Sequence, residues 1–71
     1  MTVAISRKST KRQIGTLEID IVGSGVPGYH IDRTKLTEPV DDKVIEEIGR
    51  RVMNASSMGG DIGDFRWDVR R

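Results

Sequence analysis

One segment, residues 41–55 with the sequence DDKVIEEIGRRVMNA, carries the clearest helical pattern in the chain. Its apolar residues recur every three or four positions, which gathers them on one side of a helix. These residues are Val44, Ile45, Ile48, Val52 and Ala55. Asp41 is a suitable N-cap, and the arginines near the far end suit the negative end of the helix dipole. The segment therefore predicts one amphipathic helix whose apolar side needs another surface to pack against.

Four other segments alternate between apolar and polar residues, which is the pattern of a half-buried β-strand. They are residues 2–6, 13–22, 29–33 and 64–70. In the second segment Leu17, Ile19 and Ile21 fall on one face, and Gly15 predicts a bulge or a bend. One apolar face per strand indicates an antiparallel sheet covered on one side. The predicted fold class is α+β, a small antiparallel sheet of order β-β-β-α-β with the helix packed on one face.

Two glycine-rich segments connect these elements. Residues 23–28, GSGVPG, predict a turn, and residues 56–63, SSMGGDIG, predict a mobile loop. The first segment matches the pattern G-x-G-x-x-G, but a strand pattern follows it where a dinucleotide site requires a helix. No cofactor is therefore predicted.

Length and composition limit the size of the core. The chain has 71 residues, 35% of them hydrophobic, and it contains no cysteine. A single domain of residues 1–71 is expected, near the lower limit for folding without disulfides or metals. With one histidine in the sequence, a zinc site is not expected either. A homodimer that buries additional apolar surface is one way to compensate, and we keep it as an expectation.

The charge balance and the apolar runs exclude several classes. Twelve basic and eleven acidic residues give a net charge of +1, unlike the composition of a strongly basic nucleic-acid binder. No apolar run approaches the length of a membrane span, and residues 1–12 lack the apolar core of a signal peptide. A cytoplasmic location is expected.

His30 and Asp32 are the pair most suggestive of acid–base chemistry, because residues two apart on a strand share a face. No nucleophile or second acid is linked to them by spacing, and their face is expected to be solvated. The chain is therefore predicted to be non-enzymatic.

The last strand provides the candidate site for a protein partner. Trp67 has two interpretations that stay open: it is part of the core, or it is an interface anchor, since tryptophan and arginine dominate binding hot spots. The last strand is also expected to be an edge strand, where strand addition occurs. The candidate partner-binding residues are Arg66, Trp67, Arg70 and Arg71.

Residues 7–12, RKSTKR, form a basic segment at a predicted hairpin tip, for which three interpretations stay open: a solvated basic turn, a nucleic-acid contact, or a contact with an acidic protein partner. Its candidate nucleic-acid contacts are Arg7, Lys8, Lys11 and Arg12. Such cations hold phosphates, and Arg70 and Arg71 would join them if the last strand lay beside the first. The open sheet face argues against this function, because it carries acidic residues such as Glu18 and Asp20 where RNA-binding sheets carry aromatics.

These observations predict a non-enzymatic protein-binding module that acts stoichiometrically, as an inhibitor or adaptor. Small phage or other mobile-element genes often encode proteins of this kind, and that origin is a hypothesis from size alone. The alternative is a small nucleic-acid-binding regulator that uses the hairpin tip at residues 7–12.

Overall fold

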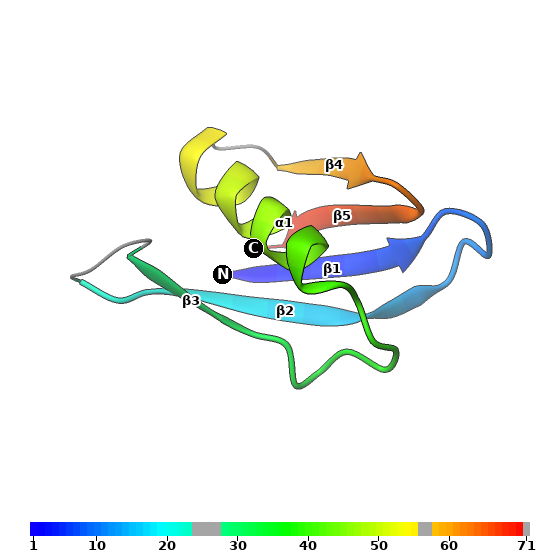
Figure 1. Ribbon diagram of the computed structural model, residues 1–71, viewed down its shortest axis with the longest axis horizontal. Coiled ribbons are helices and arrows are strands. Elements are labelled where there is room, and N and C mark those ends of the chain that lie inside the picture. Colours follow the sequence, from blue (N-terminus) through cyan, green and yellow to red (C-terminus); the bar gives the residue numbers. More distant parts are fainter. Residues whose placement is uncertain (24–27, 56–57, 71) are drawn as a thin grey trace.

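A computed structural model describes residues 1–23, 28–55 and 58–70 of the chain (Figure 1). Four residues of the turn predicted at 23–28, residues 24–27, lie outside the described part, as do the side chain of Ala55, residues 56–57 and Arg71. The elements are β1 (Thr2–Arg7), β2 (Gln13–Ile21), β3 (Tyr29–Asp32), α1 (Asp42–Ala55), β4 (Gly59–Ile62) and β5 (Phe65–Arg70).

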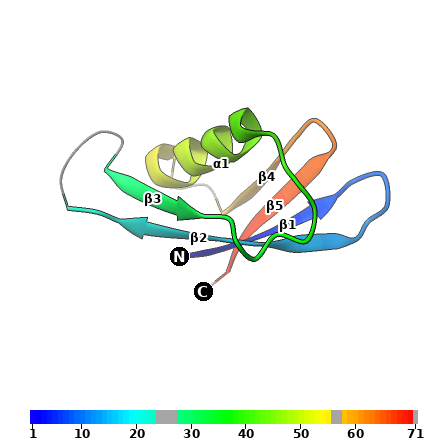
Figure 2. The same ribbon diagram turned by 60° about the horizontal axis from the view of Figure 1, so that its bottom comes forward.

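The strands form one antiparallel sheet in the order β3-β2-β1-β5-β4, and α1 lies across one face of it (Figure 2). The predicted α+β class is confirmed, and each of the four predicted strands is present. The expectation that the last strand lies at an edge is wrong, because β5 pairs with β1 on one side and with β4 on the other. The edges of the sheet are β3 and β4.

The fifth strand, β4, lies where a loop was expected. Residues 59–62 pair with β5, with Gly60 opposite Trp67 and Asp61 opposite Arg66, so the loop prediction is wrong for this segment. A Cβ atom on Gly60 would lie 3.0 Å from Cζ2 of the Trp67 indole. Glycine here permits a close approach of two strands beside a large ring, which a sequence pattern does not separate from a flexible loop.

The predicted bulge at Gly15 is confirmed. Ile5 pairs with Gly15 but Ser6 pairs with Gln13, so one residue of β2 is left over between them. Gly15 has a φ of +132°, and a Cβ atom there would lie 2.4 Å from the carbonyl oxygen of Lys35. Only glycine tolerates this position, where the connection from β3 to α1 crosses the sheet.

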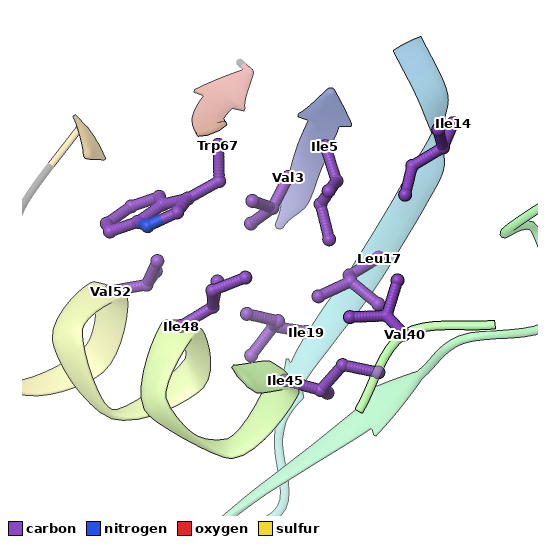
Figure 3. Close-up of a cluster of buried hydrophobic side chains, with 10 residues drawn as sticks. All are labelled: Val3, Ile5, Ile14, Leu17, Ile19, Val40, Ile45, Ile48, Val52 and Trp67. Atoms are coloured by element: carbon purple, nitrogen blue, oxygen red, sulfur yellow. The ribbon is translucent and has the colours of Figure 1, made fainter. Parts of the chain in front are cut away.

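The core lies between α1 and the sheet (Figure 3). Asp41 caps the helix as predicted, because its carboxylate accepts a hydrogen bond from the Lys43 N–H at 2.9 Å. Ile21 does not join the core as expected; its side chain is 74% exposed, since β2 extends beyond the part that the helix covers. The core side chains are those of Val3, Ile5, Ile14, Leu17, Ile19, Val40, Ile45, Ile48, Val52 and Trp67.

Candidate functional site

The antiparallel pairing of β1 with β5 decides which cations meet. Ser6 lies opposite Arg66, and Thr2 lies opposite Arg70. Arg66 is therefore beside the β1–β2 hairpin tip, whereas Arg70 lies at the far end of β1. The expectation that Arg70 joins the basic tip is wrong for this reason, and Arg71 falls outside the described residues.

Arg66 and the hairpin tip together enclose a hollow of about 600 Å³ on the sheet face opposite α1, which we call the tip hollow. Arg66 and Asp61 are opposite each other on β5 and β4, so β4 completes its wall. The side chains of Lys8, Lys11 and Arg66 are exposed. The lining residues are Ser6, Arg7, Lys8, Lys11, Asp61, Arg66 and Asp68.

Asp64, in the turn between β4 and β5, fixes the position of the tip. Its carboxylate accepts hydrogen bonds from the Ser9 N–H at 3.0 Å and the Ser9 hydroxyl at 2.8 Å. Its main-chain carbonyl accepts the Lys8 N–H at 2.7 Å. The Ser9 hydroxyl is the largest of the causes that lower the pKa of Asp64, and Arg7 adds to it. Ser9 is thus engaged within the chain.

Arg7 is half-buried and is held in place by two acids and a ring. Its Nε donates to the Glu38 carboxylate at 2.9 Å, and its Nη1 lies 3.3 Å from the Asp64 carboxylate. The guanidinium also lies 4.9 Å from the centre of the Phe65 ring. The hydrogen bond to Glu38 is the main reason that the pKa of Arg7 is raised. Arg7 is therefore a structural cation.

The other cations of the tip differ in their partners. Lys8 Nζ lies 3.2 Å from the Asp61 carboxylate, an ion pair at the surface. Lys11 occupies the left-handed backbone region with a φ of 58°, and this turn points it into the tip hollow. Within residues 1–23, 28–55 and 58–70, Lys11, Arg12 and Arg66 have no ion pair. Lys11 and Arg66 are the cations that the hollow offers to a partner.

Trp67 belongs to the core. Its side chain is 1% exposed and lies close to Val3 and Val52 on the helix side of the sheet (Figure 3). Of the two interpretations, the structure supports the first, because an indole buried on this face has no surface to present to a partner. Its N–H finds no acceptor among the described residues.

His30 and Asp32 share the open face, as expected, but their surroundings are those of a surface strand. Asp32 accepts a hydrogen bond from the Thr34 N–H at 2.8 Å, which is the main cause that lowers its pKa, and His30 contributes less. His30 is exposed and lies opposite Asp20 of β2. In the described part of the chain, no group of three or more His, Asp or Glu side chains is arranged to hold a metal.

A second hollow, of about 670 Å³, was not anticipated from the sequence. It lies between α1 and the edge strand β3, and we call it the α1–β3 groove. Gly49 allows the helix to approach here, because a Cβ atom on it would lie 2.6 Å from Cδ1 of Ile31. A glycine in the middle of an amphipathic helix was the available signal. The groove is lined by Tyr29, Ile31, Lys43, Glu46, Glu47 and Arg50.

Comparison with known proteins gives no relative: no protein-family model, curated protein or solved structure matches this chain. None of the helical residues described forms a segment long and apolar enough to cross a membrane.

Proposed function

We propose that the chain is a non-enzymatic protein-binding module that acts stoichiometrically, as an inhibitor or adaptor, and that the tip hollow receives its partner. One observation carries this proposal. The pairing of β1 with β5 brings Arg66, from the last strand, beside Lys8 and Lys11 of the hairpin tip. Two sets of residues that are far apart in the sequence thus line one concave surface.

The charges of both signs in the hollow favour a protein over a nucleic acid. Lys11 and Arg66 stand beside Asp61 and Asp68. Phosphates carry charge of one sign, so these carboxylates repel a nucleic-acid backbone while the lysine and arginine attract it. A protein surface supplies both signs, and complementary charges on it fix its orientation and exclude other partners.

A nucleic-acid-binding regulator is the second candidate. Its support is that Lys11 and Arg12 have no ion pair among the described residues. Its weakness is that Arg7 and Lys8, the other two cations of the tip, are already paired with Glu38, Asp64 and Asp61. The cytoplasmic location and the mobile-element origin remain predictions from the sequence.

Affinity capture from a cell lysate, with and without nuclease, separates the two candidates. The baits are the parent chain, Arg66→Glu in the hollow, and Arg70→Glu at the far end of the same strand face. Both positions are exposed, so the two variants make the same charge change without disturbing the core. We expect the parent and Arg70→Glu to retain one defined protein after nuclease treatment, and Arg66→Glu to recover at least about tenfold less of it.

A double variant, Lys11→Ala with Arg12→Ala, tests the alternative. If recovery depends on nucleic acid and this variant loses it, the function is nucleic-acid binding. Purified complexes would then weaken steeply with salt, by roughly 0.7–0.9 in log K per phosphate contact for each tenfold rise. Equal capture by Arg66→Glu and Arg70→Glu would show that the tip hollow is not the binding surface.

A further inference from the structure

The edge strand β3 directs backbone groups away from the sheet, and the hydrogen bonds of β2 show which ones. The Ile19 N–H donates to the Met1 carbonyl at 2.8 Å, and the Met1 amine donates to the Ile19 carbonyl at 3.0 Å. Ile19 therefore turns its N–H and C=O toward β1. In an antiparallel sheet its opposite residue on the other side, Ile31, is then in a non-hydrogen-bonded pair.

The N–H and C=O of Ile31 consequently point outward from the edge, and by the same alternation those of Tyr29 do too. The Val22 N–H, which donates to the Gly28 carbonyl at 3.1 Å, fits this alternation. No residue in the described ranges donates to or accepts from these outward groups of Tyr29 and Ile31. The strand contains no proline or lysine and its pairing with β2 has no bulge, so its short length of 4 residues is the one usual edge protection that it has.

We propose that β3 pairs antiparallel with β3 of a second copy of this chain, with Ile31 on the two-fold axis. Residues opposite each other in an antiparallel pair must point to the same face. The two-fold axis of a symmetric pairing must therefore pass through a residue and not between two residues. Most residues of β3 are paired only if that residue is Ile31 or His30. These two registers make different contacts.

The contacts favour Ile31 on the axis. Its outward N–H and C=O then meet the same groups of the second copy, in a hydrogen-bonded pair. His30 lies opposite Asp32 of the second copy, which opposes a basic group with a carboxylate on each side of the axis. The alternative register opposes His30 with His30 and leaves Asp32 without a basic residue opposite.

The other face of the sheet is also compatible with a second copy. The Ile31 side chain is half-buried and lines the α1–β3 groove, so the two isoleucines would meet on the helix side. The charged side chains of the groove are two basic and two acidic ones, so the two symmetric grooves face each other without a net charge. These side chains are Lys43, Glu46, Glu47 and Arg50.

This pairing leaves the tip hollow uncovered. The hollow is built on β1, β5 and β4, and β3 is at the opposite edge of the sheet. The dimer would present two tip hollows on one continuous open face. Dimerisation does not depend on what binds in the hollow, so the two proposals can fail separately.

The first test measures mass against concentration by sedimentation equilibrium. We expect the mass to rise from 7.9 kDa to twice that value as the concentration increases from micromolar to millimolar. His30→Glu should raise the dissociation constant at least about tenfold, because it places a glutamate opposite Asp32 of the second copy on each side of the axis. His30→Lys is the matched control, and its dimer should be at least as tight as that of the parent.

His30 is exposed and makes no side-chain hydrogen bond to the described residues, but position 30 also lies opposite Asp20 of β2 within the chain. The comparison of dissociation constants is therefore made on variants whose circular dichroism spectrum and urea midpoint match those of the parent. A mass of 7.9 kDa at every concentration would overturn the proposal. So would equal dissociation constants for His30→Glu and His30→Lys.

The second test fixes the register by disulfide trapping, which the absence of native cysteine makes free of background. Ile31→Cys should form a covalent dimer on mild oxidation, because opposite Cα atoms in a hydrogen-bonded pair are about 5.5 Å apart, within disulfide range. Asp61→Cys on the other edge is the control and should stay monomeric. Trapping of Asp61→Cys or His30→Cys in preference to Ile31→Cys would overturn the proposed pairing.

Discussion

The two edge strands of the sheet, β4 and β3, differ in whether other parts of the chain contact their outward backbone groups. At β4, the Arg51 guanidinium reaches from α1 to the carbonyl oxygen of Asp61, at 3.5 Å, and Lys8 pairs with the Asp61 carboxylate. At β3, the outward groups of Tyr29 and Ile31 meet no donor or acceptor from the described residues. One edge is thus shielded by the chain's own side chains, and the other is presented beside a groove. An unshielded edge is a place where a second strand can add.

The largest expected difference in stability is between the β3 edge and the β5 strand on which β4 packs, and Trp67→Ala tests it. Trp67 packs beside Gly60 of β4 and is 1% exposed, so truncation should lower the free energy of unfolding by about 3–5 kcal/mol. For a domain of this size that loss unfolds much of the population. The comparison variant at the β3 edge, His30→Ala, should change the free energy of unfolding by less than about 0.5 kcal/mol. Urea denaturation followed by circular dichroism measures both.

A smaller difference is expected when a methyl group is added near each edge. In Gly60→Ala the new Cβ would lie 3.0 and 3.2 Å from two atoms of the Trp67 ring, whose side chain is part of the buried core. In Gly49→Ala the new Cβ would lie 2.6 Å from Cδ1 at the end of the Ile31 side chain and 3.0 Å from Cε2 of the Tyr29 ring. Both side chains are only half-buried and line the α1–β3 groove, so they have more freedom to shift than Trp67.

We expect Gly60→Ala to destabilise by about 1–2 kcal/mol. Gly49→Ala should be less harmful, because alanine favours a helix over glycine by about 1 kcal/mol and offsets the contact with Ile31. The midpoints of urea unfolding for the two variants make the comparison. A larger loss for Gly49→Ala would mean that the contact between α1 and β3 is the more rigid one.

The smallest expected effect is on the stability of the fold at low pH. The folded pKa of Asp64 is below its ordinary value of 3.8, so its contribution is present above that pH and is lost as the pH falls through the folded pKa. Because the Ser9 hydroxyl is the main cause of the lowered pKa, Ser9→Ala should make the loss of stability in acid smaller. The melting temperature should then fall less steeply below about pH 4.

Asp32 at the β3 edge provides the comparison, since its pKa is lowered first by the Thr34 main-chain N–H and then by the Thr34 side chain, both two residues away in the sequence. Ser9→Ala should leave the contribution of Asp32 unchanged. An unaltered acid profile in Ser9→Ala would contradict the role assigned to the Asp64–Ser9 contact.

The local elements were predictable because their signals are local. The spacing of Ile45, Ile48 and Val52, with Asp41 before them, was sufficient to predict a capped helix, and alternation was sufficient to predict β1, β2, β3 and β5. Gly15 marked the bulge because no other residue fits its backbone. By contrast, Gly59–Ile62 lacks alternation and begins with two glycines, so β4 was missed although it forms a hairpin with β5, the strand that follows it.

The candidate site could be predicted only in pieces. Arg66 and the cations of the hairpin tip were each singled out from the sequence, but their meeting depends on the register of β1 with β5. Two acids of the β4–β5 region, Asp61 and Asp64, decide which of those cations remain available. The burial of Trp67 likewise depended on which face of β5 the helix covers.

The central place of β1 in the sheet has a consequence for the order of folding. Residues 2–7 pair on one side with β2, which follows them directly, and on the other with β5, where Thr2 meets Arg70. The meander of β1, β2 and β3 needs only short loops to close, whereas the β1–β5 pairing closes nearly the whole chain. Pairings between distant segments slow folding. We therefore expect the docking of the β4–β5 hairpin onto β1 to limit the refolding rate of this small protein.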